Sequence, residues 1–121
     1  MASNTLPKTM KALVQEEKDA PLVLKEVPTP EAGPGSVVVK IIANLLQHQT
    51  PGILNGQAGF TYPTPIIPGG RAIGRIAATG PDTTAFEPGQ LVLLEMFIRA
   101  RDNSDDWIFW GTMEGATAGS R

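Results

Sequence analysis

The chain of 121 residues is the size of one domain, and its 10 basic and 12 acidic side chains give a formal net charge of -2. It has no basic run that would hold nucleic acid and no apolar stretch near the roughly 18 residues that a membrane-spanning helix needs. The absence of cysteine excludes disulfides, thiolate nucleophiles and cysteine-bound metals, and His48 is the only imidazole.

The glycine and proline content indicates the fold class. The chain contains 13 Gly and 11 Pro, together well above the roughly 12% of average usage, which indicates many turns between short elements. We therefore expect a mostly β protein with at most one short helix. Residues 1–9 carry neither an apolar block nor an Arg-rich pattern, so a cytoplasmic location is expected.

The first two predicted strands form a pair. Thr9–Gln15 interleaves polar and apolar residues, and the charged cluster Glu16–Asp19 after it is typical of an exposed turn. The segment from Leu22 to Val27, which lies between prolines, favours a second strand that pairs with the first. The run from Pro28 to Gly35 is rich in proline and glycine and is expected to be an irregular connector.

Three further strands are predicted downstream. Ser36 to Ala43 holds the densest β-branched run, so it is expected to be buried on both faces in the core. Residues 44–55 allow at most a turn or two of helix, because Pro51 interrupts the pattern. Gly69 to Gly80 predicts a glycine-marked fourth strand, and Gln90 to Leu94, after a Pro-Gly turn, predicts a fifth.

Residues 99–121 are predicted to be an irregular carboxy-terminal extension. Trp107, Phe109 and Trp110 gather large aromatic side chains where no further element is predicted to cover them. Two readings remain open. The cluster folds back on the barrel, or it is a surface for a protein partner or for self-association.

Several segments resemble the opening of medium-chain dehydrogenase/reductases, the superfamily of zinc-type alcohol dehydrogenases and quinone oxidoreductases. The resemblance covers about residues 10–95, and residues 97–115 look like a fungal-type branch of alcohol dehydrogenases with a GroES-like domain. The segments that carry it are Met10–Val14, Val27–Pro30, Gly33–Lys40, Pro63–Pro68, Gly69–Gly80 and Phe86–Val92.

The resemblance implies a GroES-like distorted β-barrel over residues 1–98 that forms the substrate side of a cleft. In that family a following Rossmann domain binds NAD or NADP, and this sequence stops before any such domain. We therefore expect a truncated chain with no cofactor of its own, and NADP or NAD in a full-length relative. Gly69-Gly70 follows a proline loop and opens no predicted helix, so it is interpreted as structural and not as a phosphate-binding turn.

The sequence departs from the family at its metal ligands. Zinc-dependent members place a Cys-His pair after the third strand and a Gly-His-Glu before the fourth. Here the alignment puts Gln47 and His48 at the first place and Thr50 where an aspartate is common. Gly70 and Arg71 stand at the second. The resemblance therefore implies a zinc-independent protein, comparable to quinone and enoyl reductases, although their Asn-Pro-x-Asp run is absent here.

Four polar residues are candidates for a substrate cleft. His48 either donates a hydrogen bond to a substrate or ribose or is a surface residue. Arg71 either binds a phosphate or carboxylate or pairs with an acidic residue on the barrel rim. Gln47 and Thr50 either orient a carbonyl or cap a helix. No catalytic, cofactor-binding or metal-binding residue is assigned.

Two hypotheses follow. The first is the amino-terminal, substrate-side domain of a zinc-independent NAD(P)-dependent oxidoreductase that is inactive as an isolated chain, with a small-molecule substrate once a Rossmann domain completes it. The second is a stand-alone, non-catalytic GroES-like module that binds a partner or serves as an accessory subunit.

Overall fold

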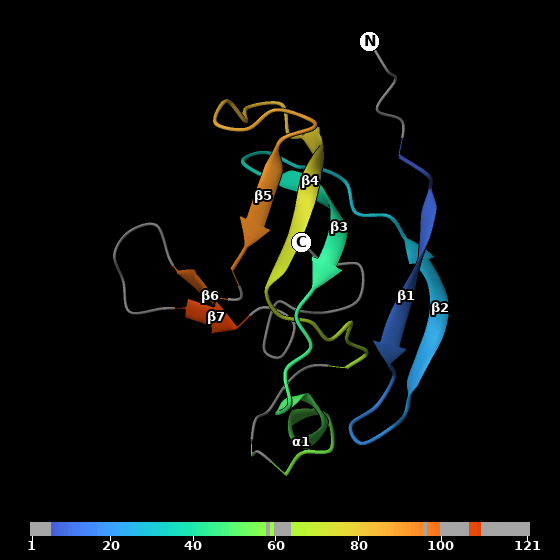
Figure 1. The fold of residues 1–121 in the computed structure, drawn as a ribbon. Helices are drawn as coiled ribbons and strands as arrows, with labels where there is room; N and C mark the ends of the chain where they lie inside the picture. Colours follow the sequence, from blue (N-terminus) through green and yellow to red (C-terminus); the bar gives the residue numbers. More distant parts are fainter. Residues whose placement is uncertain (1–5, 58, 60–63, 96, 100–106, 110–121) are drawn as a thin grey trace.

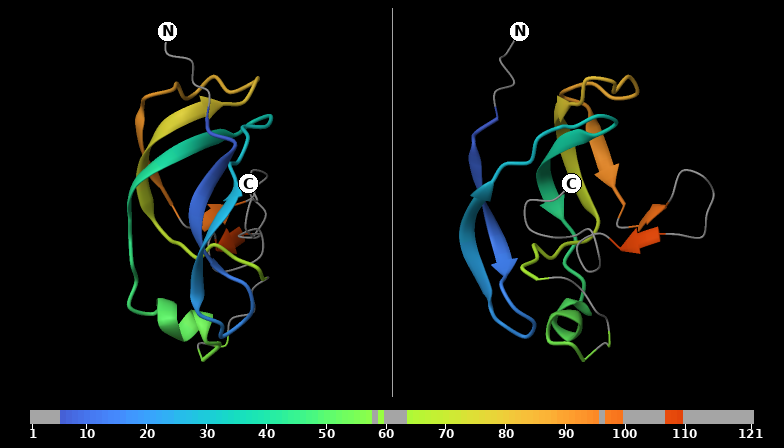
Figure 2. Two further views of the ribbon diagram at one scale, coloured as in Figure 1. Left: turned by 90° about the vertical axis from the view of Figure 1, so that its right-hand side faces the viewer. Right: turned by 180° about the vertical axis from the view of Figure 1, so that it is seen from behind.

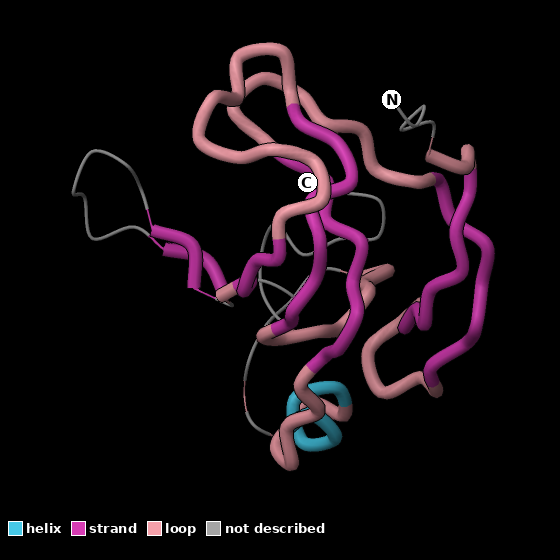
Figure 3. Tube along the Cα trace, turned by 45° about the horizontal axis from the view of Figure 1, so that its top comes forward, coloured by secondary structure: helices cyan, strands magenta, loops and turns pink. Residues whose placement is uncertain are grey.

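The computed structural model describes residues 6–57, 59, 64–95, 97–99 and 107–109, and the last two segments are described as backbone. Within these residues the chain is mostly β with one short helix, which confirms the predicted fold class (Figure 3). No helix in them is long and apolar enough to span a membrane. The elements in chain order are β1 (Thr9–Gln15), β2 (Leu22–Pro28), β3 (Val37–Asn44), α1 (Thr50–Leu54), β4 (Ala72–Thr79), β5 (Leu91–Leu94), β6 (Phe97–Arg99) and β7 (Trp107–Phe109).

Strands β1 and β2 form the antiparallel hairpin that the sequence predicts. Their register runs from the pair of Thr9 and Pro28 to the pair of Gln15 and Leu22. The turn between them contains Asp19 at a φ of 65°, a left-handed conformation that aspartate tolerates better than most residues. The expected pairing of the first two strands is therefore confirmed.

The second sheet has the order β3-β4-β5, with all pairs antiparallel. Register shifts occur on β3 between Val38 and Val39 and between Ile41 and Ala43, so β3 is irregular along its pairing with β4. Gly74 lies at this irregular pairing, where an added Cβ would collide with the carbonyl oxygen of Lys40. The glycine in the fourth strand thus marks a close backbone approach, as its pattern indicates.

The hairpin lies beside the three-stranded sheet, and α1 lies beyond the end of β3 (Figures 1 and 2). The segment between α1 and β4 is bonded to the hairpin at Ile66. The backbones of Gln15 and Ile66 exchange two hydrogen bonds of 2.9 and 3.0 Å. The buried apolar residues among those described are Ala12, Val14, Val27, Ile53, Ile66, Ala72 and Ile76.

Strand β3 differs from its prediction. Val37–Val39 is half-buried, and the part from Lys40 to Asn44 is exposed, with 61% of Ile42 accessible. The prediction that this strand is buried on both faces is therefore wrong. A continuous β-branched run indicates two covered faces only where a second layer covers each of them, and the exposure of residues 40–44 shows that this part of β3 is not covered in this way.

The segment beyond residue 98 also contains an element that the sequence did not predict. Strand β7 pairs with β6 in an antiparallel ladder that places Phe97 opposite Phe109 and Arg99 opposite Trp107. The expectation of a wholly irregular extension over residues 99–121 is therefore wrong for Arg99, the last residue of β6, and for residues 107–109. The side chains of β6 and β7, and residue Trp110, lie outside the description, so the two readings of the aromatic cluster stay predictions.

Candidate functional site

The candidate cleft residues come together at the end of the sheet where β3 ends and β4 begins. The backbone N–H of Leu45 donates a 2.9 Å hydrogen bond to the carbonyl oxygen of Arg71, so the two segments lie side by side. Directly after Leu45 the chain enters a turn in which the N–H of Thr50 donates to the carbonyl oxygen of Gln47 at 3.1 Å. This end of the sheet therefore carries both segments that hold the predicted residues.

Arg71 is paired with an acidic side chain. Its Nε lies 3.1 Å from Oε1 of Glu95 and donates to Oε2 at 3.3 Å, and each side chain is about half exposed. This pair is the one that the rim reading of Arg71 expects, and a role of Arg71 toward a phosphate or carboxylate stays a prediction. The sequence analysis did not name Glu95. Its place follows from the register of β4 with β5, in which Ala72 pairs with Leu94, so that their neighbours Arg71 and Glu95 lie next to that pair.

The N-cap position of α1 is held by neither of the candidate residues. Gln49 is the N-cap residue and makes no side-chain capping hydrogen bond, and Thr50 is already the first residue of the helix. Gln47 and Thr50 are half-buried and His48 is exposed. The roles of Gln47, His48 and Thr50 toward a substrate stay predictions.

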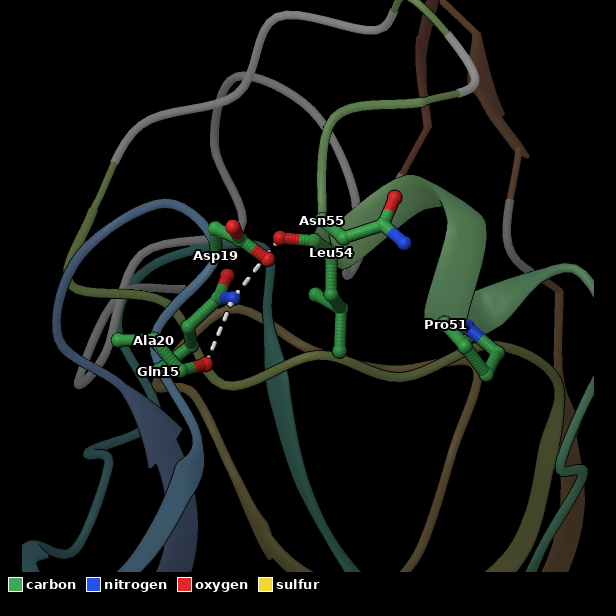
Figure 4. A pocket seen from close by; sticks show the side chains of 6 residues that line it. All are labelled: Gln15, Asp19, Ala20, Pro51, Leu54 and Asn55. Atoms are coloured by element: carbon green, nitrogen blue, oxygen red, sulfur yellow. Dashed lines mark hydrogen bonds between the residues drawn. The ribbon is translucent and has the colours of Figure 1, made fainter.

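A buried glutamine anchors the opposite end of α1. Gln15 is 1% exposed, and its Nε2 donates to the carbonyl oxygens of Ala20 at 3.1 Å and Leu54 at 2.9 Å (Figure 4). The N–H of Asp19 donates to the same Leu54 oxygen at 3.0 Å. The β1–β2 turn and the last turn of α1 are thereby joined. The sequence gives no signal for this role, because a glutamine that ends a strand is usually exposed.

None of the four candidates lines either of two hollows among the described residues. The first, of about 250 Å³, lies against Gln15 and the end of α1. The second, of about 550 Å³, lies at the other end of the barrel, between the segment from Pro28 to Ala32 and the end of β4. The candidate residues therefore lie outside both hollows.

The donor set does not fit a zinc site of the kind found in zinc-type alcohol dehydrogenases. Such a site needs three or four thiolate, imidazole or carboxylate ligands, whereas the chain has no cysteine and one histidine. The described residues bring together no group of three His, Asp or Glu side chains.

A dinucleotide site does not fit the described residues either. Its phosphates need a glycine-rich turn that leads into a helix N-terminus. Gly69-Gly70 leads instead into strand β4, as predicted, and the helix α1 has only five residues.

The chain is similar in sequence to dehydrogenases. Residues 33–119 match the family described as "Alcohol dehydrogenase GroES-like domain". An alcohol dehydrogenase of Rhizobium meliloti is 36% identical over 84 residues, which is 69% of this chain and 25% of that protein. An L-threonine 3-dehydrogenase of Mesorhizobium japonicum is 34% identical over 85 residues, with the same two coverages. The chain thus spans about a quarter of the length of these relatives.

Solved structures share the fold. An alcohol dehydrogenase superfamily protein from Novosphingobium aromaticivorans superposes with a TM-score of 0.66 at 34% identity, over 73% of this chain and 27% of that one. The crotonyl-CoA carboxylase/reductase AntE, solved in complex with NADP, superposes with a TM-score of 0.75 over 96% of this chain and 35% of that one. Its 20% identity is evidence for the shared fold alone.

Proposed function

Because the chain belongs to the alcohol dehydrogenase GroES-like domain family, we propose that it is the substrate-side domain of a zinc-independent, NAD(P)-dependent oxidoreductase. The observation that carries this proposal is the composition of the sheet end. An amide, a hydroxyl, an imidazole and a guanidinium occur there, on Gln47, Thr50, His48 and Arg71, and the chain has too few metal ligands for a zinc site of the family's kind.

Arg71 is the group best suited to act on a substrate oxygen. A guanidinium keeps its positive charge and presents several N–H donors in a fixed plane. Here Glu95 holds Nε, and about half of the Arg71 side chain is open to solvent. An exposed ion pair of this kind is weak, so a carbonyl oxygen can share the guanidinium without a large cost. Gln47 and Thr50 orient such an oxygen by hydrogen bonding but cannot transfer a proton unaided.

The isolated chain is proposed to be inactive. Hydride transfer requires a nicotinamide held against the substrate, and the described residues offer no dinucleotide site. When NADPH is titrated into the purified chain, we expect its fluorescence neither to shift nor to be quenched. Micromolar binding would contradict this part of the proposal.

A chimaera tests the activity itself. The chain replaces the matched quarter of the Rhizobium meliloti alcohol dehydrogenase, and NADPH consumption is measured with enones and aldehydes, with and without a metal chelator. We expect turnover that the chelator does not reduce. Arg71→Gln should lower kcat/KM by about 100-fold, the typical effect of losing one donor to a developing oxyanion.

Arg75→Gln is the matched control for the chimaera. Arg75 lies on β4, and its Nη1 donates to the carbonyl oxygen of Gly89, in the turn before β5, at 2.9 Å. We expect this variant to keep the activity of the parent chimaera. Equal losses in the two variants would contradict a role for Arg71, and loss of turnover with the chelator would contradict zinc independence.

A non-catalytic binding module is the second candidate. It is favoured by the surface of the described residues, which exposes twelve large hydrophobic side chains, more than the seven apolar residues that the core buries. The aromatic residues Trp107, Phe109 and Trp110 are proposed as part of such a surface. If Trp107→Ser and Trp110→Ser together leave every association of the chain unchanged, the aromatic part of this proposal is wrong.

A further inference from the structure

Helix α1 ends at the only Asn-Gly pair of the sequence, Asn55-Gly56, and Asn55 is its C-cap residue. Asparagine is a chemically labile residue. Its side chain reacts most readily before glycine, because no Cβ hinders the approach of the next backbone nitrogen. The other three asparagines, at positions 4, 44 and 103, precede larger residues. Asn55 is therefore the asparagine most open to reaction with its own backbone.

The reaction that Asn55 can undergo needs only water. The backbone nitrogen of Gly56 bonds to Cγ of Asn55 while the bond from Cγ to Nδ2 breaks, and ammonia leaves with the proton of the Gly56 amide. The two groups belong to neighbouring residues, so the ring closure is intramolecular. Water then opens the cyclic imide. Opening at Cγ leaves an aspartate, and opening at the main-chain carbonyl carbon leaves an isoaspartate, in which the chain runs through the former side chain.

The folded backbone keeps the two reacting atoms apart. At the ψ of 0° that Asn55 adopts, the nitrogen of Gly56 eclipses the nitrogen of Asn55, whereas a five-membered ring needs it near Cβ. The N–H of Gly56 donates to the carbonyl oxygen of Ile53 at 3.1 Å. Oδ1 of Asn55 accepts a hydrogen bond of 2.9 Å from the N–H of Gln57. Ring closure therefore requires the last turn of α1 to open.

The turn between β1 and β2 holds this last turn of α1 in place. The carbonyl oxygen of Leu54 accepts hydrogen bonds from Nε2 of Gln15 at 2.9 Å and from the N–H of Asp19 at 3.0 Å (Figure 4). The end of the Lys18 side chain lies against Gly56, where a Cβ would otherwise be. A helix of five residues is not stable by itself. These contacts therefore decide how often the turn opens.

We propose that Asn55 is a site of spontaneous deamidation and isoaspartate formation, that the contact between α1 and the β1–β2 turn controls its rate, and that the modification releases α1 from this turn. Isoaspartate adds a carbon atom to the main chain before Gly56, so the Gly56 N–H no longer meets Ile53 in helical geometry. Both products also place a negative charge at the C-terminal end of α1, where the helix dipole disfavours it. Asp19, which lines the same hollow as Asn55, adds to this repulsion.

Mass spectrometry of proteolytic fragments measures the conversion in the full 121-residue chain, kept at neutral pH and physiological temperature. We expect conversion at Asn55 that is slower in the folded chain than in the same chain in urea. Gln15→Met should raise the rate in the folded chain about tenfold, which corresponds to about 1.4 kcal/mol. Gln57→Met is the matched control, because Gln57 is exposed and its backbone N–H is kept. It should react like the unchanged chain.

Amide NMR spectra show whether each variant is folded, and hydrogen exchange of the Asp19 amide reports the release of α1. We expect this amide to exchange faster after conversion of Asn55 than before. Equal rates in the folded chain and in urea overturn the proposal, and this comparison does not depend on the folding of any variant. Equal rates in folded Gln15→Met and Gln57→Met overturn it too, as does unchanged Asp19 exchange after conversion. None of these results involves NADPH, so they do not decide the proposed oxidoreductase role.

Discussion

The hairpin β1–β2 and the sheet β3-β4-β5 use their apolar residues in different ways. The hairpin supplies the cluster of Ala12, Val14 and Val27, which is at most 9% exposed. The sheet has the longer aliphatic runs and buries Ala72 and Ile76, yet its Ile42 and Leu93 are more than 60% exposed, as is Leu24 of the hairpin. The richness of a strand in aliphatic residues therefore does not decide its burial. What decides it is whether another layer lies on that face.

The hairpin is covered because other segments are bonded to it. Ile66 is bridged to Gln15 by two backbone hydrogen bonds, and the Gln15 side chain reaches the end of α1. These bonds pair the segment after α1 with the edge of β1, and Ile67 of that segment packs against the buried cluster of the hairpin. Among the described residues, no element is bonded in this way to the outer face of β4 and β5. Matched substitutions at one site in each region test this difference.

The largest effect is expected when the same substitution is made at a buried and an exposed isoleucine. Ile66→Ala removes a side chain that is 0% exposed and should lower the free energy of unfolding by about 2–5 kcal/mol. Ile42→Ala on β3, at 61% exposure, should change it by less than about 0.5 kcal/mol. Urea unfolding followed by tryptophan fluorescence measures both. Equal losses would mean that the outer face of the sheet is covered in solution.

A second pair of variants tests the backbone of the sheet against that of the helix. Gly74→Ala would place a Cβ against the Lys40 carbonyl oxygen and should cost about 1–3 kcal/mol, since the backbone must shift. Gly52→Ala in α1 meets no atom within 4 Å and should stabilise the chain by about 0.5–1 kcal/mol. Thermal unfolding of the two variants gives the signs. A stabilising Gly74→Ala would show that β3 and β4 do not approach closely here.

The strands show how far the sequence predicts this fold. Alternation in β1, β-branched content in β2 and β3, and Pro-Gly boundaries placed β1 to β5 within a few residues of their observed limits, because residue composition and turn chemistry are local properties. The exposure of β3 was not predictable in this way. Burial depends on which segment lies over a strand, and that is a property of the whole fold.

The candidate site was predictable to a lesser degree. The end of β3 and the start of β4 could be located, and the pairing of Arg71 with an acidic residue was one of the two readings of that side chain. The role of Gln15 was not, since its partners Ala20 and Leu54 lie 5 and 39 residues away and are backbone oxygens that any residue supplies. Strand β7 was missed because three residues between polar and glycine-rich segments give too short a pattern.

The anchor between the hairpin and α1 is tested by removing its donor. Gln15→Met keeps the approximate shape of the side chain but leaves carbonyl oxygens of Ala20 and Leu54 without this partner, so we expect a loss of about 1–3 kcal/mol. Gln57→Met, at an exposed glutamine beyond the helix, should have little effect. Amide hydrogen exchange should accelerate around Leu54 in the first variant alone. Unchanged exchange there would mean that α1 does not depend on the hairpin.

The smallest effect is expected at the Arg71–Glu95 pair, and its smallness is informative. A double-mutant cycle with Arg71→Gln and Glu95→Gln should give a coupling below about 1 kcal/mol that decreases with added salt, because both side chains are about half exposed. A pair that contributes so little to stability leaves the guanidinium free to exchange Glu95 for a substrate oxygen. A coupling of several kcal/mol would instead fix Arg71 as a structural residue and remove it from the proposed cleft.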